Sequence, residues 1–124
     1  MAMDVPDTDF YVALYEIQPD GTSIQLTTDQ MRARYRESLR EAKLVKPGEI
    51  NRYEFDKFLF FSRRVTKGSR LRLVLASGNS IYVQKNYNSG GDVARETAKD
   101  ARTAHITVYH DAEHPSSLTL PVVK

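Results

Sequence analysis

The sequence predicts an all-β domain with the architecture of a jelly roll or galactose-binding-like β-sandwich. Several short stretches alternate apolar and polar residues with the period of two that a half-buried strand requires. Turn signals containing proline or glycine separate these stretches, and helical periodicity is limited to one short stretch near residues 36–43. The 124 residues suit a single domain with one core, so we treat residues 1–124 as one unit.

A β-hairpin is predicted near the N-terminus. Residues 9–17 are rich in aromatic and branched side chains, and residues 24–27 alternate with period two. Between them, Pro19-Asp20-Gly21 is a turn signal, because proline presets φ and glycine accepts a positive φ. We therefore expect two antiparallel strands joined by this turn.

The arginine-rich stretch over residues 30–43 carries two conflicting patterns. Met31, Tyr35 and Leu39 are spaced as on a helix, yet the first half also alternates apolar side chains with arginines, as a strand does. We interpret it as extended to about Arg36, with a short helical turn after that residue. Glutamates among the arginines predict an ion-paired, solvated face rather than a phosphate-binding patch. The residues of this face are Arg32, Arg34, Arg36, Arg40, Glu37 and Glu41.

Further strands are predicted in the second half of the chain. Residues 49–59 alternate, Lys67-Gly68 marks a turn, and residues 70–76 place leucines on one face and arginines on the other. Residues 78–102 read as a long surface loop with a short strand at 80–83. Closing strands are expected at 103–109 and 117–123. We expect the sheet core to be lined by Leu71, Leu73, Leu75, Leu118, Leu120 and Val122.

Composition restricts the class of protein. The formal net charge of +2 is too small to indicate a nucleic-acid partner, and no apolar run is long enough for a membrane helix. The absence of cysteine excludes disulfides, thiolate metal sites and cysteine nucleophiles. No signal-peptide pattern opens the sequence, which favours a cytoplasmic location.

One motif resembles a zinc-peptidase signature. His110-Asp111-Ala112-Glu113-His114 matches H-x-x-E-H, which needs both histidines on one face of a helix. Pro115 follows at once and the flanking segments read as strands, so we interpret the motif as a surface turn. A small metallopeptidase, with His105 as third ligand, is the remaining alternative.

Other chemistry is weakly represented. The chain has no G-x-S-x-G nucleophile turn and no phosphate-binding glycine loop. Asp4, Asp7 and Asp9 admit a paired-acid glycosidase, but a loop whose carboxylates bond to backbone N–H groups is the preferred interpretation. Tyr82 and Tyr87 are candidates for a sugar-binding platform. We therefore predict no catalytic, cofactor-binding or metal-binding residue in this chain.

A set of segments occurs in a characteristic order along most of the chain. These are Pro6-Asp7-Thr8-Asp9-Phe10, Pro19-Asp20-Gly21, Arg32-Ala33-Arg34-Tyr35-Arg36-Glu37-Ser38, Pro47-Gly48-Glu49, Lys67-Gly68-Ser69-Arg70-Leu71-Arg72-Leu73 and Tyr109-His110-Asp111-Ala112-Glu113-His114-Pro115-Ser116-Ser117-Leu118-Thr119-Leu120-Pro121-Val122. In this order they resemble the C-terminal domain of X-Pro dipeptidyl-peptidases, cocaine esterases and related acyl hydrolases. The resemblance runs from about Asp4 to Val123.

The resemblance implies a jelly-roll domain that is non-catalytic by itself. The family's Ser-Asp-His triad and helical cap lie in other domains, and His110 and His114 match its closing turn rather than its catalytic histidine. The expected partners are therefore the hydrolase and cap domains of the same parent chain. The expected role is to stabilise the hydrolase domain and help shape its substrate entrance. An autonomous carbohydrate- or ligand-binding β-sandwich is the alternative.

Two segments depart from the family pattern. The family has a tryptophan-proline pair where this chain has Lys57-Phe58-Leu59-Phe60-Phe61 and no tryptophan. It also has the motif NFPRFDRN where this chain reads Ser80-Ile81-Tyr82-Val83-Gln84-Lys85-Asn86. Because both segments could face the hydrolase domain, the parent's substrate stays open among acyl esters, β-lactam-like amides and X-Pro peptides.

The start of the resemblance bears on the sheet. In the family, strands of the jelly roll precede the segment that corresponds to Asp7-Thr8-Asp9-Phe10. We therefore expect a sheet without its N-terminal strands, with backbone groups unpaired at one edge. Such an edge predicts a homodimer or the exchange of a strand between copies.

Overall fold

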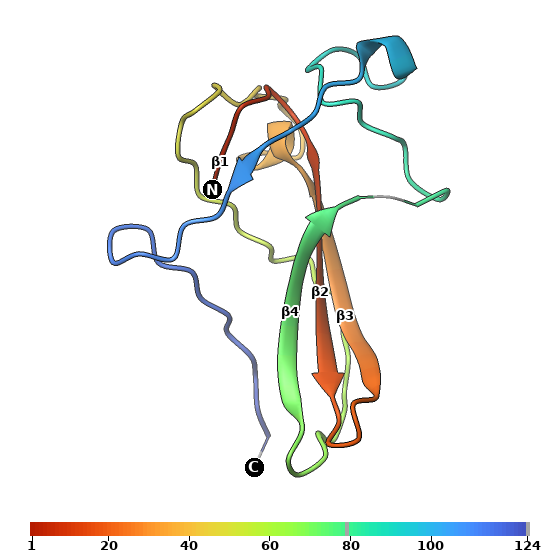
Figure 1. The fold of residues 1–124 in the computed structure, drawn as a ribbon, viewed down its shortest axis with the longest axis vertical. Helices are drawn as coiled ribbons and strands as arrows, with labels where there is room; N and C mark the ends of the chain where they lie inside the picture. Colours follow the sequence, from red (N-terminus) through yellow and green to blue (C-terminus); the bar gives the residue numbers. More distant parts are fainter. Residues whose placement is uncertain (79, 124) are drawn as a thin grey trace.

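The computed structural model describes residues 1–78 and 80–123, and it confirms the all-β class (Figure 1). The strands are β1 (Ala2–Met3), β2 (Asp9–Ile17), β3 (Ser23–Arg32), β4 (Arg70–Ser77) and β5 (Ile106–Thr107). Two single-turn 3-10 helices, η1 (Ala33–Tyr35) and η2 (Ala98–Asp100), complete the regular structure. In the described part of the chain, neither helix has the length and apolar character needed to cross a membrane.

An antiparallel sheet with the strand order β3-β2-β4 forms the body of the domain, and β1 pairs with β5 in a second, small sheet. The predicted hairpin is confirmed: β2 covers the expected residues, and Gly21 adopts φ +89° in the turn. The Gly21 N–H donates to the Gln18 carbonyl at 2.9 Å, and Thr22 N–H donates to the Asp20 carboxylate at 2.9 Å. β3 continues past the predicted end to Arg32.

The main core lies at the end of the sheet where β2 begins. Phe10 is buried there and packs edge-on against Tyr53, with ring centroids 5.1 Å apart. The Tyr53 hydroxyl is buried without a hydrogen-bond partner among the described residues, and burial raises the pKa of Tyr53 to about 12. The buried apolar members of this cluster are Met3, Val5, Phe10, Ala33 and Val45.

The prediction that the β4 leucines line the core was wrong. Leu71, Leu73 and Leu75 are 47%, 49% and 37% exposed, although they lie opposite Glu16, Leu14 and Val12 on the same face as these buried β2 residues. The segment that covers this face of the sheet, residues 53–66, makes its hydrogen bonds to β2 and β3 and not to β4. Alternation therefore identified the face correctly, but nothing in the described residues covers its β4 side.

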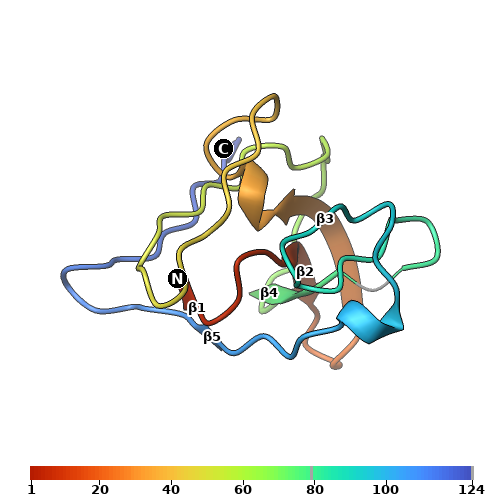
Figure 2. The same ribbon diagram turned by 90° about the horizontal axis from the view of Figure 1, so that it is seen from above.

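The C-terminal core residues also differ from the prediction. Leu118 is 43% exposed and Val122 is 82% exposed, whereas Leu120 is half-buried. Residues 117–123 form no strand, and the closing strand expected at 103–109 is reduced to β5. In Figures 1 and 2 the C-terminal segment runs as an extended trace separate from the sheet. Without a partner strand its alternating pattern produces no ladder.

Three local predictions differ from the structure. The helical turn expected at 36–43 is absent; the only turn of helix here is η1, and the chain then loops back so that the Lys43 N–H donates to the Arg34 carbonyl at 2.8 Å. The Arg36 guanidinium fills this loop and donates to the Ala33 and Lys43 carbonyls. Residues 49–59 alternate in burial but join no ladder, and residues 80–83 form a turn.

Candidate functional site

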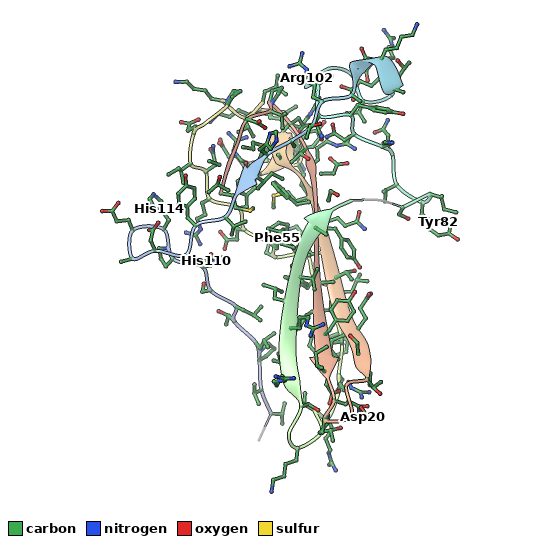
Figure 3. The ribbon with its side chains drawn as sticks, viewed as in Figure 1. Asp20, Phe55, Tyr82, Arg102, His110 and His114 are labelled. Carbon is green, nitrogen blue, oxygen red and sulfur yellow. The ribbon has the colours of Figure 1, made fainter. Side chains whose placement is uncertain are left out.

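The H-x-x-E-H motif folds as a turn. The backbone N–H groups of Glu113 and His114 donate to one Asp111 carboxylate oxygen at 3.0 and 2.7 Å, and His114 Nδ1 lies 2.9 Å from the same oxygen. These hydrogen bonds from His114 hold the pKa of Asp111 below its usual value. Figure 3 places His110 and His114 on this projecting turn, away from the sheet. The helix on which zinc ligation by this motif depends is not formed.

His105 is engaged elsewhere. Its Nδ1 lies 2.7 Å from an Asp4 carboxylate oxygen, and its backbone N–H donates to the other oxygen at 2.8 Å. Across residues 1–78 and 80–123, no three histidine, cysteine, aspartate or glutamate side chains form a group able to hold a metal ion. That this chain has no metal site remains a prediction.

A buried carboxylate network lies beneath the long loop. Asp7 is fully buried and accepts hydrogen bonds from Arg34 N–H at 2.9 Å, from Arg34 Nε at 2.7 Å and from Asn86 Nδ2 at 2.8 Å. Asn86 Nδ2 also lies 2.9 Å from an Asp9 oxygen, and Asp9 pairs with Arg32 Nε at 2.8 Å. A carboxylate buried in this way cannot reach a substrate. The arrangement therefore serves to hold the loop, which disfavours the glycosidase interpretation.

The arginines complete this anchor. Arg32 Nη1 donates to the Gln84 side chain at 3.2 Å, and Arg34 Nη2 donates to the Gly91 carbonyl at 2.9 Å. The predicted ion-paired character of the arginine stretch is thus present, but two of the pairs are made with Asp7 and Asp9 rather than with neighbouring glutamates. The hydrogen bond from Arg32 to Asp9 raises the pKa of Arg32.

The long loop is ordered by its own contacts as well. The Asn88 side chain donates to the Arg102 carbonyl at 2.8 Å, and Ser89 Oγ bonds to Glu96. Gly90 has φ +82°, and a Cβ at this position would lie 2.8 Å from Pro6 Cγ. The loop therefore requires glycine here, because both the backbone conformation and the close approach to Pro6 exclude a side chain.

The tip of this loop presents large apolar groups to solvent. Ile81 and Tyr82 are 91% and 90% exposed, and Figure 3 shows Tyr82 projecting from the domain. The second candidate for a sugar platform, Tyr87, is half-buried, with the Lys85 ammonium 5.0 Å from its ring centroid. A second exposed apolar site lies at Phe60, which is 94% exposed, beside Leu59.

A second buried carboxylate, Glu16, joins the covering segment to β2. It is fully buried and accepts hydrogen bonds from Arg63 Nε at 2.5 Å, Thr66 N–H at 2.9 Å and Ser69 Oγ at 2.7 Å. The Arg63 hydrogen bond, followed by those of Thr66 and Ser69, lowers the pKa of Glu16 to about 2. Sequence reasoning missed this residue, although a lone charge in the apolar stretch 10–17 is a signal for it.

Comparison with known proteins identifies the family. Residues 1–119 match the family described as the X-Pro dipeptidyl-peptidase C-terminal non-catalytic domain. The chain belongs to this family. The resemblance inferred from the ordered motifs is therefore confirmed, and the β-sandwich fold is that of an X-Pro dipeptidyl-peptidase C-terminal domain.

Two longer proteins are similar to this X-Pro dipeptidyl-peptidase C-terminal domain. The cocaine esterase of Rhodococcus sp. (strain MB1 Bresler) is 36% identical over 118 residues, which cover 95% of this chain and 20% of the esterase. The crystal structure of an aminopeptidase from the marine sediment archaeon Thaumarchaeota archaeon matches with a TM-score of 0.85 at 22% identity, over 92% of this chain and 20% of that chain. The second likeness shows the fold alone. The chain thus spans about one fifth of each protein that it matches.

Proposed function

We propose that this domain acts within a serine hydrolase, where it stabilises the hydrolase domain and shapes the entrance to its active site. The observation that carries the proposal is the pair of exposed apolar sites, Ile81-Tyr82 and Leu59-Phe60. Exposed aromatic and branched side chains of this size on an ordered surface are typical of contact sites for another protein surface. Both sites lie in the segments that depart from the family pattern.

The carboxylate network supports this role because it fixes the loop before any contact is made. Asn86 binds Asp7 and Asp9, and Arg32 binds Gln84, so the residues that follow the Ile81-Tyr82 tip are held to β2 and β3. A loop that is already ordered loses little conformational entropy on docking. The tip is therefore suited to form one wall of a substrate entrance.

The chemistry in this proposal belongs to the hydrolase domain. There a serine attacks the substrate carbonyl, a histidine accepts its proton, and an aspartate orients the histidine. The residues of the present chain contribute contacts and exclude water at the entrance. The substrate class stays open among acyl esters, amides and X-Pro peptides.

The test combines this chain with the part of the Rhodococcus cocaine esterase outside the matched 20%. The two parts are co-expressed, and the melting temperature and the half-life of ester hydrolysis are measured with and without this chain. We expect the chain to raise both. The double variant Ile81→Ser, Tyr82→Ser should raise the melting temperature and the half-life less than the wild type does. The control variant Leu39→Ser changes an exposed leucine outside both apolar sites and should act like the wild type.

Two results would contradict the proposal. The first is turnover of nitrophenyl acyl esters or X-Pro nitroanilides by the chain alone. The second is that the double variant stabilises the esterase part as fully as the wild type does, which would show that Ile81 and Tyr82 do not contribute to the contact. Binding of oligosaccharides by the chain alone, lost in Tyr82→Ala, would instead support the carbohydrate-binding alternative.

A further inference from the structure

An open pocket lies at the base of the loop that carries Ile81 and Tyr82. In Figures 1 and 2 the chain that leaves β4 crosses to the β3 side of the sheet, and the pocket forms where this chain passes the end of β3. Its volume is about 240 Å³, and Met31, Tyr35 and Val83 are among the residues that line it. The pocket therefore adjoins the first of the two apolar sites on which the proposed function rests.

The Arg32 side chain joins the two sides of this pocket. Its Nε donates to an Asp9 carboxylate oxygen on β2 at 2.8 Å, and its Nη1 donates to the Gln84 side chain on the loop at 3.2 Å. Two residues further along the loop, Asn86 binds Asp7 and Asp9. Contacts within this chain thus form the pocket before a partner arrives, so a group that enters it does not have to order the loop first.

The chemistry of the lining favours an aromatic ring. Met31, Tyr35 and Val83 are half-buried, and Arg32 lines the same pocket with its side chain 21% exposed. A thioether makes favourable contacts with the edge of a ring, and a guanidinium is attracted to the face of a ring. A tyrosine adds an edge-to-face or offset stacking contact. An aliphatic side chain would gain only apolar burial here, so the lining selects for an aromatic one.

The size of the pocket distinguishes a protein side chain from a substrate. A cavity of about 150 Å³ holds a benzene ring, whereas sites for small-molecule ligands have volumes of about 300–1,000 Å³. The volume of about 240 Å³ lies between these values. It accommodates one aromatic side chain, but it is too small for a substrate that carries both an acyl group and a leaving group.

We propose that this pocket receives one phenylalanine, tyrosine or tryptophan side chain from the hydrolase or cap domain of the same protein. The assignment rests on the proposed function and names the chemistry of the partner at that site. An aromatic anchor in a pocket, surrounded by contacts that exclude water, is the usual arrangement of the residues that dominate a protein interface. Ile81 and Tyr82, which are 91% and 90% exposed beside the pocket, supply the surrounding contacts.

The first test needs only this chain and a tyrosine side-chain analogue, p-cresol. The chain has three methionines, of which Met31 lines the pocket and Met3 lies in the buried core. With methyl-labelled methionine, p-cresol should shift the Met31 methyl signal saturably through its ring current, with a dissociation constant of about 1–10 mM. The Met3 signal should stay in place. A Met31 shift no larger than that of Met3 would overturn the proposal.

The second test fills the pocket from within the chain. Val83→Phe should abolish the p-cresol response and leave the melting temperature of the chain unchanged or higher, because it fills a cavity. When the esterase part used above is titrated with the chain, Val83→Phe should weaken the association at least about 10-fold. The control Val122→Phe makes the same substitution at a residue that is 82% exposed and does not line the pocket, so it should behave like the wild type.

The outcomes separate this proposal from the proposed function. If Val83→Phe loses p-cresol binding but associates with the esterase part as tightly as the wild type does, the pocket is not the docking point, and the proposed function still stands. If the wild-type chain does not associate at all, both are overturned. If a nitrophenyl ester shifts the Met31 signal at lower concentration than p-cresol does, the pocket is a substrate subsite, which also overturns the proposal.

Discussion

Replacing Asp7 with asparagine should destabilise the domain far more than the loss of an ordinary surface charge. Asp7 is fully buried, and the Arg34 side chain paired with it is 12% exposed. The substitution keeps the shape of the side chain but leaves the guanidinium without its counter-charge. Removing one member of a buried ion pair costs about 3–5 kcal/mol. At a urea m-value of about 1.5 kcal/mol/M, the unfolding midpoint should fall by roughly 2–3 M.

The matched control is Glu54→Gln. Glu54 pairs with Arg52 at 3.3 Å, but these side chains are 69% and 85% exposed, so the expected cost is about 0–1 kcal/mol. Urea unfolding followed by circular dichroism compares the two variants. Native-state hydrogen exchange should show that Asp7→Asn first deprotects residues 84–91, which the network holds. A cost for Asp7→Asn equal to that of Glu54→Gln would refute the reasoning.

Three further predictions concern the core and its buried polar groups. Phe10→Ala should cost about 3–5 kcal/mol in urea unfolding, whereas Leu73→Ala should cost less than half as much, because Leu73 is about half exposed. The pKa of Glu16 is lowered from its ordinary value of 4.5 to about 2, so its stabilisation is complete above pH 4.5 and is lost as the pH falls towards 2. The stability difference between wild type and Glu16→Gln, measured by thermal melts, should therefore shrink over that range; a constant difference would contradict this. Tyr53→Phe removes a buried hydroxyl that has no hydrogen-bond partner among the described residues, so it should leave the melting temperature unchanged or raise it. A clear decrease would indicate that the hydroxyl does form a hydrogen bond.

Local signals predicted the parts of the fold that depend on neighbouring residues. Alternation and the Pro19-Asp20-Gly21 turn were sufficient for the hairpin of β2 and β3, because a turn with positive φ at glycine closes it without help from distant residues. The leucine pattern of β4 was equally clear. Alternation identifies which residues share a face, but it carries no information about whether another layer covers that face.

The remaining errors come from contacts between segments far apart in sequence. Composition favoured a helical turn after Arg36, yet the Arg36 side chain bonds to the Ala33 and Lys43 carbonyls and closes a loop instead. The contact of Asn86 with Asp7 joins residues 79 positions apart, and no local pattern predicts it. The sequence shows that a carboxylate, Asp7, lies shortly before β2, but it does not show that Asn86 is the residue that binds it.

The two buried carboxylates, Glu16 and Asp7, have the same structural effect: each attaches a segment without regular structure to the sheet. An apolar core of a few residues is small for a sheet of this length, and the segments that cover the sheet lack regular structure. Glu16 attaches one such segment through Arg63, and Asp7 attaches the long loop through Asn86. Each carboxylate accepts several hydrogen bonds from fixed directions, so it specifies position more strictly than apolar packing does. A domain that acts by presenting loop residues to a neighbouring surface needs that positional precision more than it needs a larger core.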